Sequence, residues 1–149
     1  MLAFAHEYAR GRRIFLTTTH FHPEHAFGAQ AFRGGGDLPG QPGPGPGPGP
    51  EGPGYVEMFT GLGDAVAAQL RGVELSEPDV VYDDTYELDL GGRVVTMRAT
   101  GRGHTHGDQV VRVPDDGLMF TGDLAETGQF AIFPWFPPVD VDVSWDGSP

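Results

Sequence analysis

Short apolar segments alternate with polar turns along most of the chain, and their periods predict both helices and strands. Apolar side chains near helical spacing predict helices over residues 2–8, 24–32 and 55–70. Runs rich in β-branched and aromatic residues predict strands over 14–19, 79–82, 86–90, 94–99, 109–113 and 118–121. Hairpin turns are expected at 91–92 and 115–117. The pattern indicates an α/β mixture of hairpin-linked strands with a few helices, and we expect the strands 14–19 and 118–121 to be buried.

Residues 34–54 interrupt this pattern, because 17 of these 21 residues are Gly or Pro. Pro lacks the backbone donor that helices and central strands use, and Gly raises the entropy cost of ordering. We therefore expect a flexible insertion, joining neither a helix nor a central strand, within a single domain that spans residues 1–149. A proline-motif ligand for a partner protein is the alternative interpretation.

The charge and the residue types present exclude several functional classes. Nine Arg residues, with no Lys, stand against 21 acidic residues and give a net charge of −12. This balance disfavours nucleic acid and anionic membranes, because both bind cationic surfaces. The chain has no Cys, which excludes disulfides, thiolate metal ligands and thiol nucleophiles. With neither a membrane span nor a secretory leader visible in the sequence, we expect a soluble cytoplasmic protein that acts on a small molecule.

Four possible metal ligands lie within six residues, in the segment His-Phe-His-Pro-Glu-His. His20 and His22 follow a predicted strand and, being two positions apart, share one of its faces. Glu24 and His25 come round at the start of the next predicted helix. Imidazole and carboxylate ligands without thiolate suit Zn²⁺, and also Fe²⁺ or Mn²⁺. The alternative is a coincidental polar turn.

Two later segments carry further candidate ligands. His104 and His106 lie in Gly-His-Thr-His-Gly-Asp, just past a predicted strand, where a loop can turn a ring inward. Thr105 and Asp108 are candidates for orienting the His104 ring without binding the metal. We also expect His106 to lie outside the ligand set. Asp123 ends an apolar run, where a carboxylate is costly unless it meets a cation. A structural histidine and a turn or cap aspartate are the alternatives.

Competing metal motifs do not fit the sequence. The helical His-Glu-x-x-His pattern of metalloproteases is absent. A zinc deaminase needs a Cys pair, and an amidohydrolase barrel needs about 250 residues. A cupin has no place for the predicted helices.

The three segments together resemble the motifs of the metallo-β-lactamase superfamily in order and approximate spacing. That family has His-x-His-x-Asp-His after a strand, then Gly-His-Thr-x-Gly-Asp, then an apolar strand ending in Gly-Asp. The resemblance implies an αββα sandwich, incomplete here, in which two sheets are flanked by helices. It also implies one or two metal ions, zinc by expectation, with these ligands: His20, His22 and His104 for the first ion, and Glu24, His25 and a bridging Asp123 for the second.

The chain departs from the family pattern in three respects. Glu24 stands where the family has Asp, so its role as ligand, base or outer-shell group stays open. The family's last metal-binding His has no counterpart after Asp123, and its first strands have none before Met1. The sequence therefore resembles the centre of a family domain, truncated at both ends.

The expected function is that of a metal-dependent hydrolase, with a metal-bound hydroxide as the nucleophile. The bond attacked is an ester, thioester, amide, lactam or phosphoester, and Glu24 and Asp123 are the expected catalytic carboxylates. The alternative is an inactive fragment that only binds metal or needs a partner chain to fold. Near the end of the chain, an aromatic segment is expected to form a packed loop or to line a substrate cleft; it contains Phe130, Phe133, Trp135 and Phe136.

Overall fold

The computed structural model describes residues 2–33, 41–42, 52–101, 103–105 and 107–129. Its helices are α1 (Leu2–Ala9), α2 (Pro23–Ala26), α3 (Gly52–Thr60) and α4 (Asp64–Gln69). Its strands are β1 (Phe15–Leu16), β2 (Gln41–Pro42), β3 (Thr85–Asp89), β4 (Val94–Gly101), β5 (Asp108–Val113) and β6 (Leu118–Phe120). Single 3-10 turns occur at η1 (Ala29–Phe32), η2 (Pro114–Asp116) and η3 (Gly122–Leu124). Among these residues, no helix has both the length and the apolar character needed to cross a membrane.

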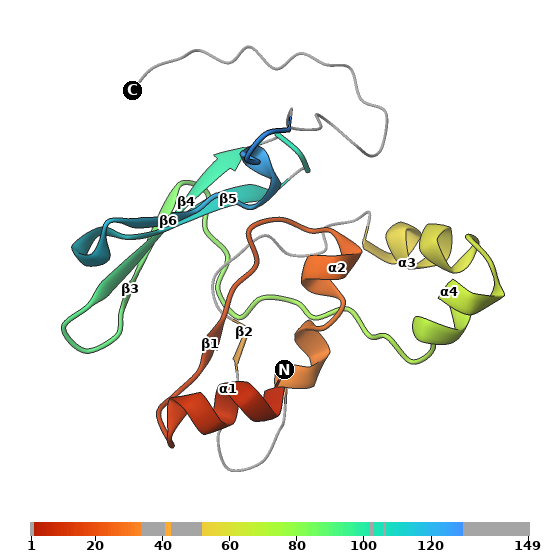
Figure 1. Cartoon of the computed structure of the whole chain (residues 1–149), viewed down its shortest axis with the longest axis horizontal. Coiled ribbons are helices and arrows are strands. Elements are labelled where there is room, and N and C mark those ends of the chain that lie inside the picture. Colours follow the sequence, from red (N-terminus) through yellow and green to blue (C-terminus); the bar gives the residue numbers. More distant parts are fainter. Residues whose placement is uncertain (1, 34–40, 43–51, 102, 106, 130–149) are drawn as a thin grey trace.

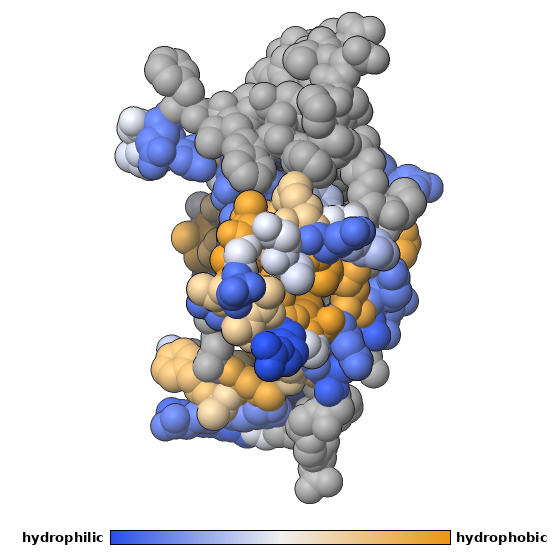
Figure 2. Space-filling view, turned by 90° about the vertical axis from the view of Figure 1, so that its right-hand side faces the viewer, coloured by the Kyte–Doolittle hydropathy of each residue, from blue (hydrophilic) through white to orange (hydrophobic). Residues whose placement is uncertain are grey.

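The described chain divides into two parts (Figure 1). The helical part consists of α1 to α4 with the short parallel pair β1–β2, and the sheet part consists of β3 to β6 with η3. On the face shown in Figure 2, hydrophobic residues gather in the middle of the molecule, with hydrophilic residues around them. The mixture of helices with a four-stranded antiparallel sheet confirms the expected fold class, an incomplete α/β sandwich.

The sheet part follows the sequence pattern closely. Its strands are all antiparallel in the order β3-β4-β5-β6, so both predicted hairpin turns are confirmed. In the first turn the Asp89 carboxylate accepts hydrogen bonds from the backbone N–H groups of Gly91 and Gly92, at 2.8 and 3.0 Å. Such side-chain bonding to a turn backbone is the reason why Asp favours this position. The sheet is therefore set by local interactions.

One face of the sheet carries apolar residues that are partners across successive strands. Tyr86 pairs with Met97, Met97 with Val111, and Val111 with Phe120. Met97 and Val111 are buried, whereas Phe120 at the edge is 54% exposed. All of β6 is exposed, so the prediction of a buried strand at 118–121 is wrong. The reason is that β6 lies at the edge of the sheet, where the described residues leave its apolar side chains uncovered.

The helical part is held by side-chain packing. Phe21, Ala26, Phe27 and Tyr55 form a buried cluster, and partly buried hydrophobic residues from α3 to the segment after α4 pack against it. The predicted helix 24–32 is divided into α2 and η1, and the predicted helix 55–70 is divided into α3 and α4. The second break lies at residues 61–63, Gly-Leu-Gly, where Gly lowers the helix propensity. The amphipathic pattern thus located the helical segments but not their interruptions.

Three other predictions need correction. The strand expected at 14–19 is only the two-residue, half-buried β1, and residues 79–82 form no strand. The Gly/Pro stretch was expected to join no helix, yet its last residues begin α3. Pro53 stands in the first turn of that helix, where the backbone N–H has no helical partner. Residues 41–42 pair with β1 as a short strand in a two-stranded sheet, and most of the stretch lies outside the described residues.

Candidate metal centre

The first histidine turn leads from β1 into α2. His20 and His22 are 2% and 5% exposed. Between them, Phe21 packs its ring against Tyr55, with ring centroids 5.7 Å apart. Phe21 is buried in the helical core, and His22 also lies beside that core, with its ring centroid 6.3 Å from that of Tyr55. The His22 carbonyl also accepts hydrogen bonds from the N–H groups of His25 and Ala26, which fixes the start of α2.

The second histidine turn is the loop between β4 and β5. Its His104 is 4% exposed, and the loop is closed by the carboxylate of Asp108, which is 1% exposed. That carboxylate accepts hydrogen bonds from the backbone N–H groups of His104 and Thr105 and from the Thr105 hydroxyl. Burial raises the pKa of the Asp108 carboxyl, and these hydrogen bonds counteract the shift only in part. Asp108 therefore fixes the backbone that carries His104 rather than the imidazole ring itself.

Asp123 reaches the histidines from η3, immediately after β6. One carboxylate oxygen, Oδ2, lies 3.7 Å from Nε2 of His20 and 3.4 Å from Nε2 of His104. The preceding Gly122 makes this approach possible, because its φ is +55° and it lies directly over the first histidine turn. A Cβ at this position would lie 2.7 Å from Cβ of Thr19, closer than real Cβ contacts allow, and 3.1 Å from Nδ1 of His20, which is tighter than most real contacts. Any side chain here would push η3 away from His20.

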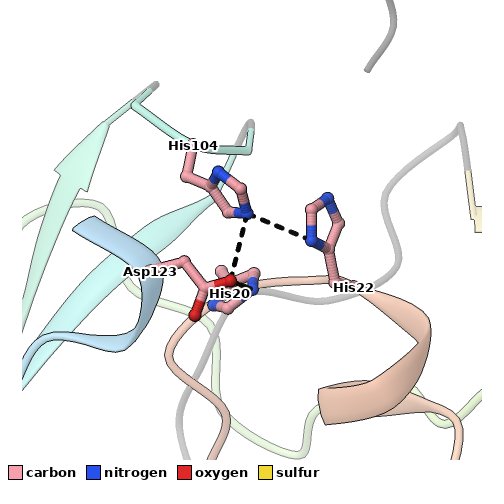
Figure 3. Close-up of side chains that lie close together, drawn as sticks. All are labelled: His20, His22, His104 and Asp123. Atoms are coloured by element: carbon pink, nitrogen blue, oxygen red, sulfur yellow. Dashed lines mark hydrogen bonds and ion pairs between the residues drawn. The ribbon is translucent and has the colours of Figure 1, made fainter. Parts of the chain in front are cut away.

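The donor atoms of His20, His22, His104 and Asp123 all lie within 4.8 Å of one another (Figure 3). Nδ1 of His22 and Nε2 of His104 are 3.1 Å apart. Two nitrogen ligands of a tetrahedral zinc ion at about 2.0–2.1 Å lie roughly 3.3 Å from each other. The observed separations of 3.1, 3.4 and 3.7 Å lie around that value. Nε2 of His20 is buried without a hydrogen-bond partner, as expected of an atom whose partner is a metal ion.

Burial also determines the protonation state of these rings. Burial, followed by the neighbouring His25 ring, lowers the pKa of His20 to about 4. Burial and the nearby His104 ring lower the pKa of His22 as well. At neutral pH both rings are therefore neutral, and the short distance between His20 and Asp123 is not an ion pair. Neutral imidazole is the form that binds a metal ion.

Glu24 and His25 lie differently from the group of four. Both are exposed on α2, and within the described residues Glu24 does not join the group. Its negative charge still acts on His22, whose pKa it raises against the larger effect of burial. Nε2 of His25 lies 3.9 Å from one Asp123 oxygen, while the other Asp123 oxygen faces His20 and His104. Asp123 thus lies between His25 on one side and His20 and His104 on the other.

Several other sequence predictions fall outside the described residues: His106 and the aromatic residues Phe130, Phe133, Trp135 and Phe136. Conversely, the sequence reasoning missed Gln109, a buried amide that hydrogen-bonds the segment before His20. The signal available was an amide side chain directly before the apolar pair Val110-Val111 of a predicted strand, because a buried amide needs hydrogen-bond partners.

Comparison with known proteins agrees with this geometry. The family model described as the metallo-beta-lactamase superfamily matches residues 13–148, which include both histidine turns and Asp123. No curated protein matches the chain.

Proposed function

Because the chain belongs to the metallo-β-lactamase superfamily, we propose that it is a metal-dependent hydrolase whose ion is held by His20, His22, His104 and Asp123. The observation that carries the proposal is the group of four donors, three of which belong to almost fully buried histidines. An N/O donor set of this kind suits zinc, and it also accepts Fe²⁺ or Mn²⁺. Most members of the superfamily are hydrolases, which favours catalysis over metal storage.

A bound zinc ion supplies Lewis acidity and lowers the pKa of water to about 7. The chain's own residues supply the rest of the site. His20, His22 and His104 are almost fully buried, whereas Asp123 is 29% exposed and His25 is 36% exposed. Substrate therefore has access from the side of Asp123 and His25. The three buried rings close the opposite side against water.

Two carboxylates have proposed catalytic roles. Asp123 places its carboxylate beside the buried rings and orients groups that enter from the exposed side. Glu24, exposed in the first turn of α2, is proposed as a base or outer-shell group rather than as a ligand of the first ion. Its effect on the pKa of His22 supports a location within electrostatic range of the site.

The proposed substrate is a small molecule with an ester, thioester, amide, lactam or phosphoester bond. The net charge of −12 disfavours nucleic acid, because a polyanion would be repelled from so acidic a surface. The family alone does not select among these bonds, because one fold and one metal site can serve many activities.

The exposed edge strand favours a second candidate: an inactive fragment that binds metal or folds fully only with a partner chain. Leu118, Met119 and Phe120 are 51, 54 and 54% exposed on β6. Adjacent apolar side chains on a sheet edge are typical of a surface that another chain covers.

Metal content and turnover distinguish the two candidates. The purified chain is loaded with zinc, its metal per chain is measured, and hydrolysis is followed on one generic substrate of each proposed bond class. The hydrolase predicts bound zinc and turnover that chelation removes, lost in His20→Ala and kept in His6→Ala, a histidine on α1 outside the site. Bound zinc without turnover of any class supports the fragment. Absence of tight binding contradicts the hydrolase and supports a fragment that needs a partner chain to fold.

A further inference from the structure

The four candidate ligands come from two parts of the molecule. His20 and His22 belong to the helical part, whereas His104 and Asp123 belong to the sheet part. His22 and His104 are 82 positions apart in the chain, and their ring nitrogens lie 3.1 Å from each other. The proposed metal centre therefore depends on contacts that hold the segment before His20 against the sheet.

Gln109 supplies several of these contacts. It is 1% exposed, and it lies at the start of β5, where it pairs with Ala99 of β4. Its side-chain amide nitrogen donates to the Thr17 hydroxyl at 2.9 Å and to the Thr18 carbonyl. Its backbone N–H donates to the Thr19 carbonyl at 2.8 Å. One residue of the sheet thus binds the three residues that immediately precede His20.

The other end of the Gln109 amide is also bound. Its carbonyl oxygen accepts a hydrogen bond from the Tyr82 hydroxyl, which comes from the segment before β3. Both amide donors and the acceptor therefore have partners, so the side chain is held in one orientation. A buried polar network that is fully satisfied makes a region rigid.

The residue before Gln109 has the matching role for the other histidine turn. The Asp108 carboxylate accepts hydrogen bonds from the backbone N–H groups of His104 and Thr105. Side chains of adjacent strand residues point to opposite faces, so Asp108 and Gln109 reach in opposite directions from one peptide unit of β5. Through this unit the two histidine turns are fixed to the same point of the sheet.

We propose that Gln109 is a positioning residue for the metal centre: it holds Thr17–Thr19 against β5 so that His20 faces His104 and Asp123. The inference rests on the metal site of the proposed function and adds a residue that touches neither the metal nor a substrate. This positioning role requires the side-chain amide of Gln109. Met in its place keeps the length of the side chain but removes both donors and the acceptor, and Glu keeps an acceptor for Tyr82 but removes the donors to Thr17 and Thr18.

The test compares metal binding by the full chain and by three variants. Gln109→Met removes the amide. Gln69→Met makes the same exchange at an exposed position of α4, outside the site. Val111→Ala removes buried apolar volume from the same strand, without a hydrogen bond to residues 17–19. Zinc and Co²⁺ affinities are measured by competition with a chromophoric chelator, and the visible spectrum of the Co²⁺ form reports the ligand geometry.

Gln109→Met is expected to weaken metal binding by about 10–100-fold, as the loss of outer-shell partners does. Its Co²⁺ spectrum should change as well, because His20 is displaced from the other donors. Gln69→Met should match the wild type, and Val111→Ala should lower the midpoint of thermal unfolding while leaving the Co²⁺ spectrum unchanged.

The possible outcomes separate the inference from the function on which it rests. If the wild-type chain binds metal and Gln109→Met has the same affinity and the same Co²⁺ spectrum, the role of Gln109 is overturned and the proposed function is not. The same holds if Val111→Ala altered the spectrum as strongly, since the effect would then reflect general destabilisation. A wild-type chain that bound no metal would refute the proposed function, and the positioning role with it.

Discussion

The sheet part and the helical part are built in different ways. In the sheet part, regular backbone pairing between consecutive strands and tight turns set the structure. In the helical part the helices are short, and the packing of Phe21, Ala26, Phe27 and Tyr55 holds them. The sheet part therefore follows from local rules, whereas the helical part needs contacts between distant residues.

The candidate metal centre lies where the two parts meet, and each part supplies two of its four donors. Two ligands from one part cannot complete a site that needs three or four. Metal affinity is therefore a direct measure of how well the parts are joined. Changes that act within one part should alter folding, and changes at the junction should alter metal binding first.

The largest effect is expected within the sheet part. Met97→Ala removes a side chain that is 2% exposed, and such truncations cost about 2–5 kcal/mol of unfolding free energy. Val94→Ala, at a position that is 38% exposed on the same strand, should change it by no more than about 0.5 kcal/mol. Urea denaturation monitored by circular dichroism measures both. Equal effects would show that β4 is not packed as described.

The next effect is expected at the junction itself. His20→Ala removes the buried Nε2 that faces Asp123. Loss of a residue that only supports a ligand lowers metal affinity by about 10–100-fold, and loss of this ligand should lower it by more. His106→Ala should lower it less, because we expect His106 outside the ligand set. Chelator competition gives both values, and similar losses in the two variants would refute this ranking.

A smaller effect is expected where η3 crosses the first histidine turn. Gly122→Ala places a Cβ against Thr19 and His20 at a φ of +55°, and the left-handed backbone alone costs roughly 1–2 kcal/mol. Gly128→Ala is the matched control, since its φ is +75° and no atom lies within 4 Å of the added Cβ. Both variants should lose stability, and Gly122→Ala alone should lose metal affinity. Equal metal affinity in the two would contradict the close approach.

The smallest effect concerns alkaline pH and the hydroxyl that holds Gln109. Burial raises the pKa of Tyr82 from 10.0 to about 12. Below pH 10 this phenol is protonated in the folded and in the unfolded chain, so its contribution to stability is fully present. The contribution is lost as the pH rises from 10 to 12, because the phenol ionises first in the unfolded chain. Tyr82→Phe should flatten this loss in urea midpoints, and Tyr86→Phe, its stacked neighbour, should not. No Lys titrates in the same range to obscure the result.

The two parts also differ in how far the sequence predicted them. The strands 86–90, 94–99 and 109–113 and both hairpins are confirmed, because alternation and turn residues act within a few positions. The helix boundaries in 24–32 and 55–70, and the strand at 79–82, were wrong, because an apolar pattern does not show where a helix is interrupted, as at Gly-Leu-Gly 61–63, or whether a strand finds a partner. The exposure of β6 was missed for a related reason: an apolar run does not reveal whether anything covers it.

By itself, the sequence determined the types of metal-donor atoms and the hairpins of this protein. Clustered imidazoles without any thiol limit the metals that bind, and Asp, Gly and alternating apolar residues build the hairpins. Only the tertiary structure decided which donors meet: Asp123 joins His20, His22 and His104, while Glu24 remains exposed outside that group. The physical reason is that these distances depend on a glycine with no room for a side chain and on a buried amide bound to a distant segment. The local sequence shows a glycine and a polar strand residue at these positions, but it does not show which distant segments they contact.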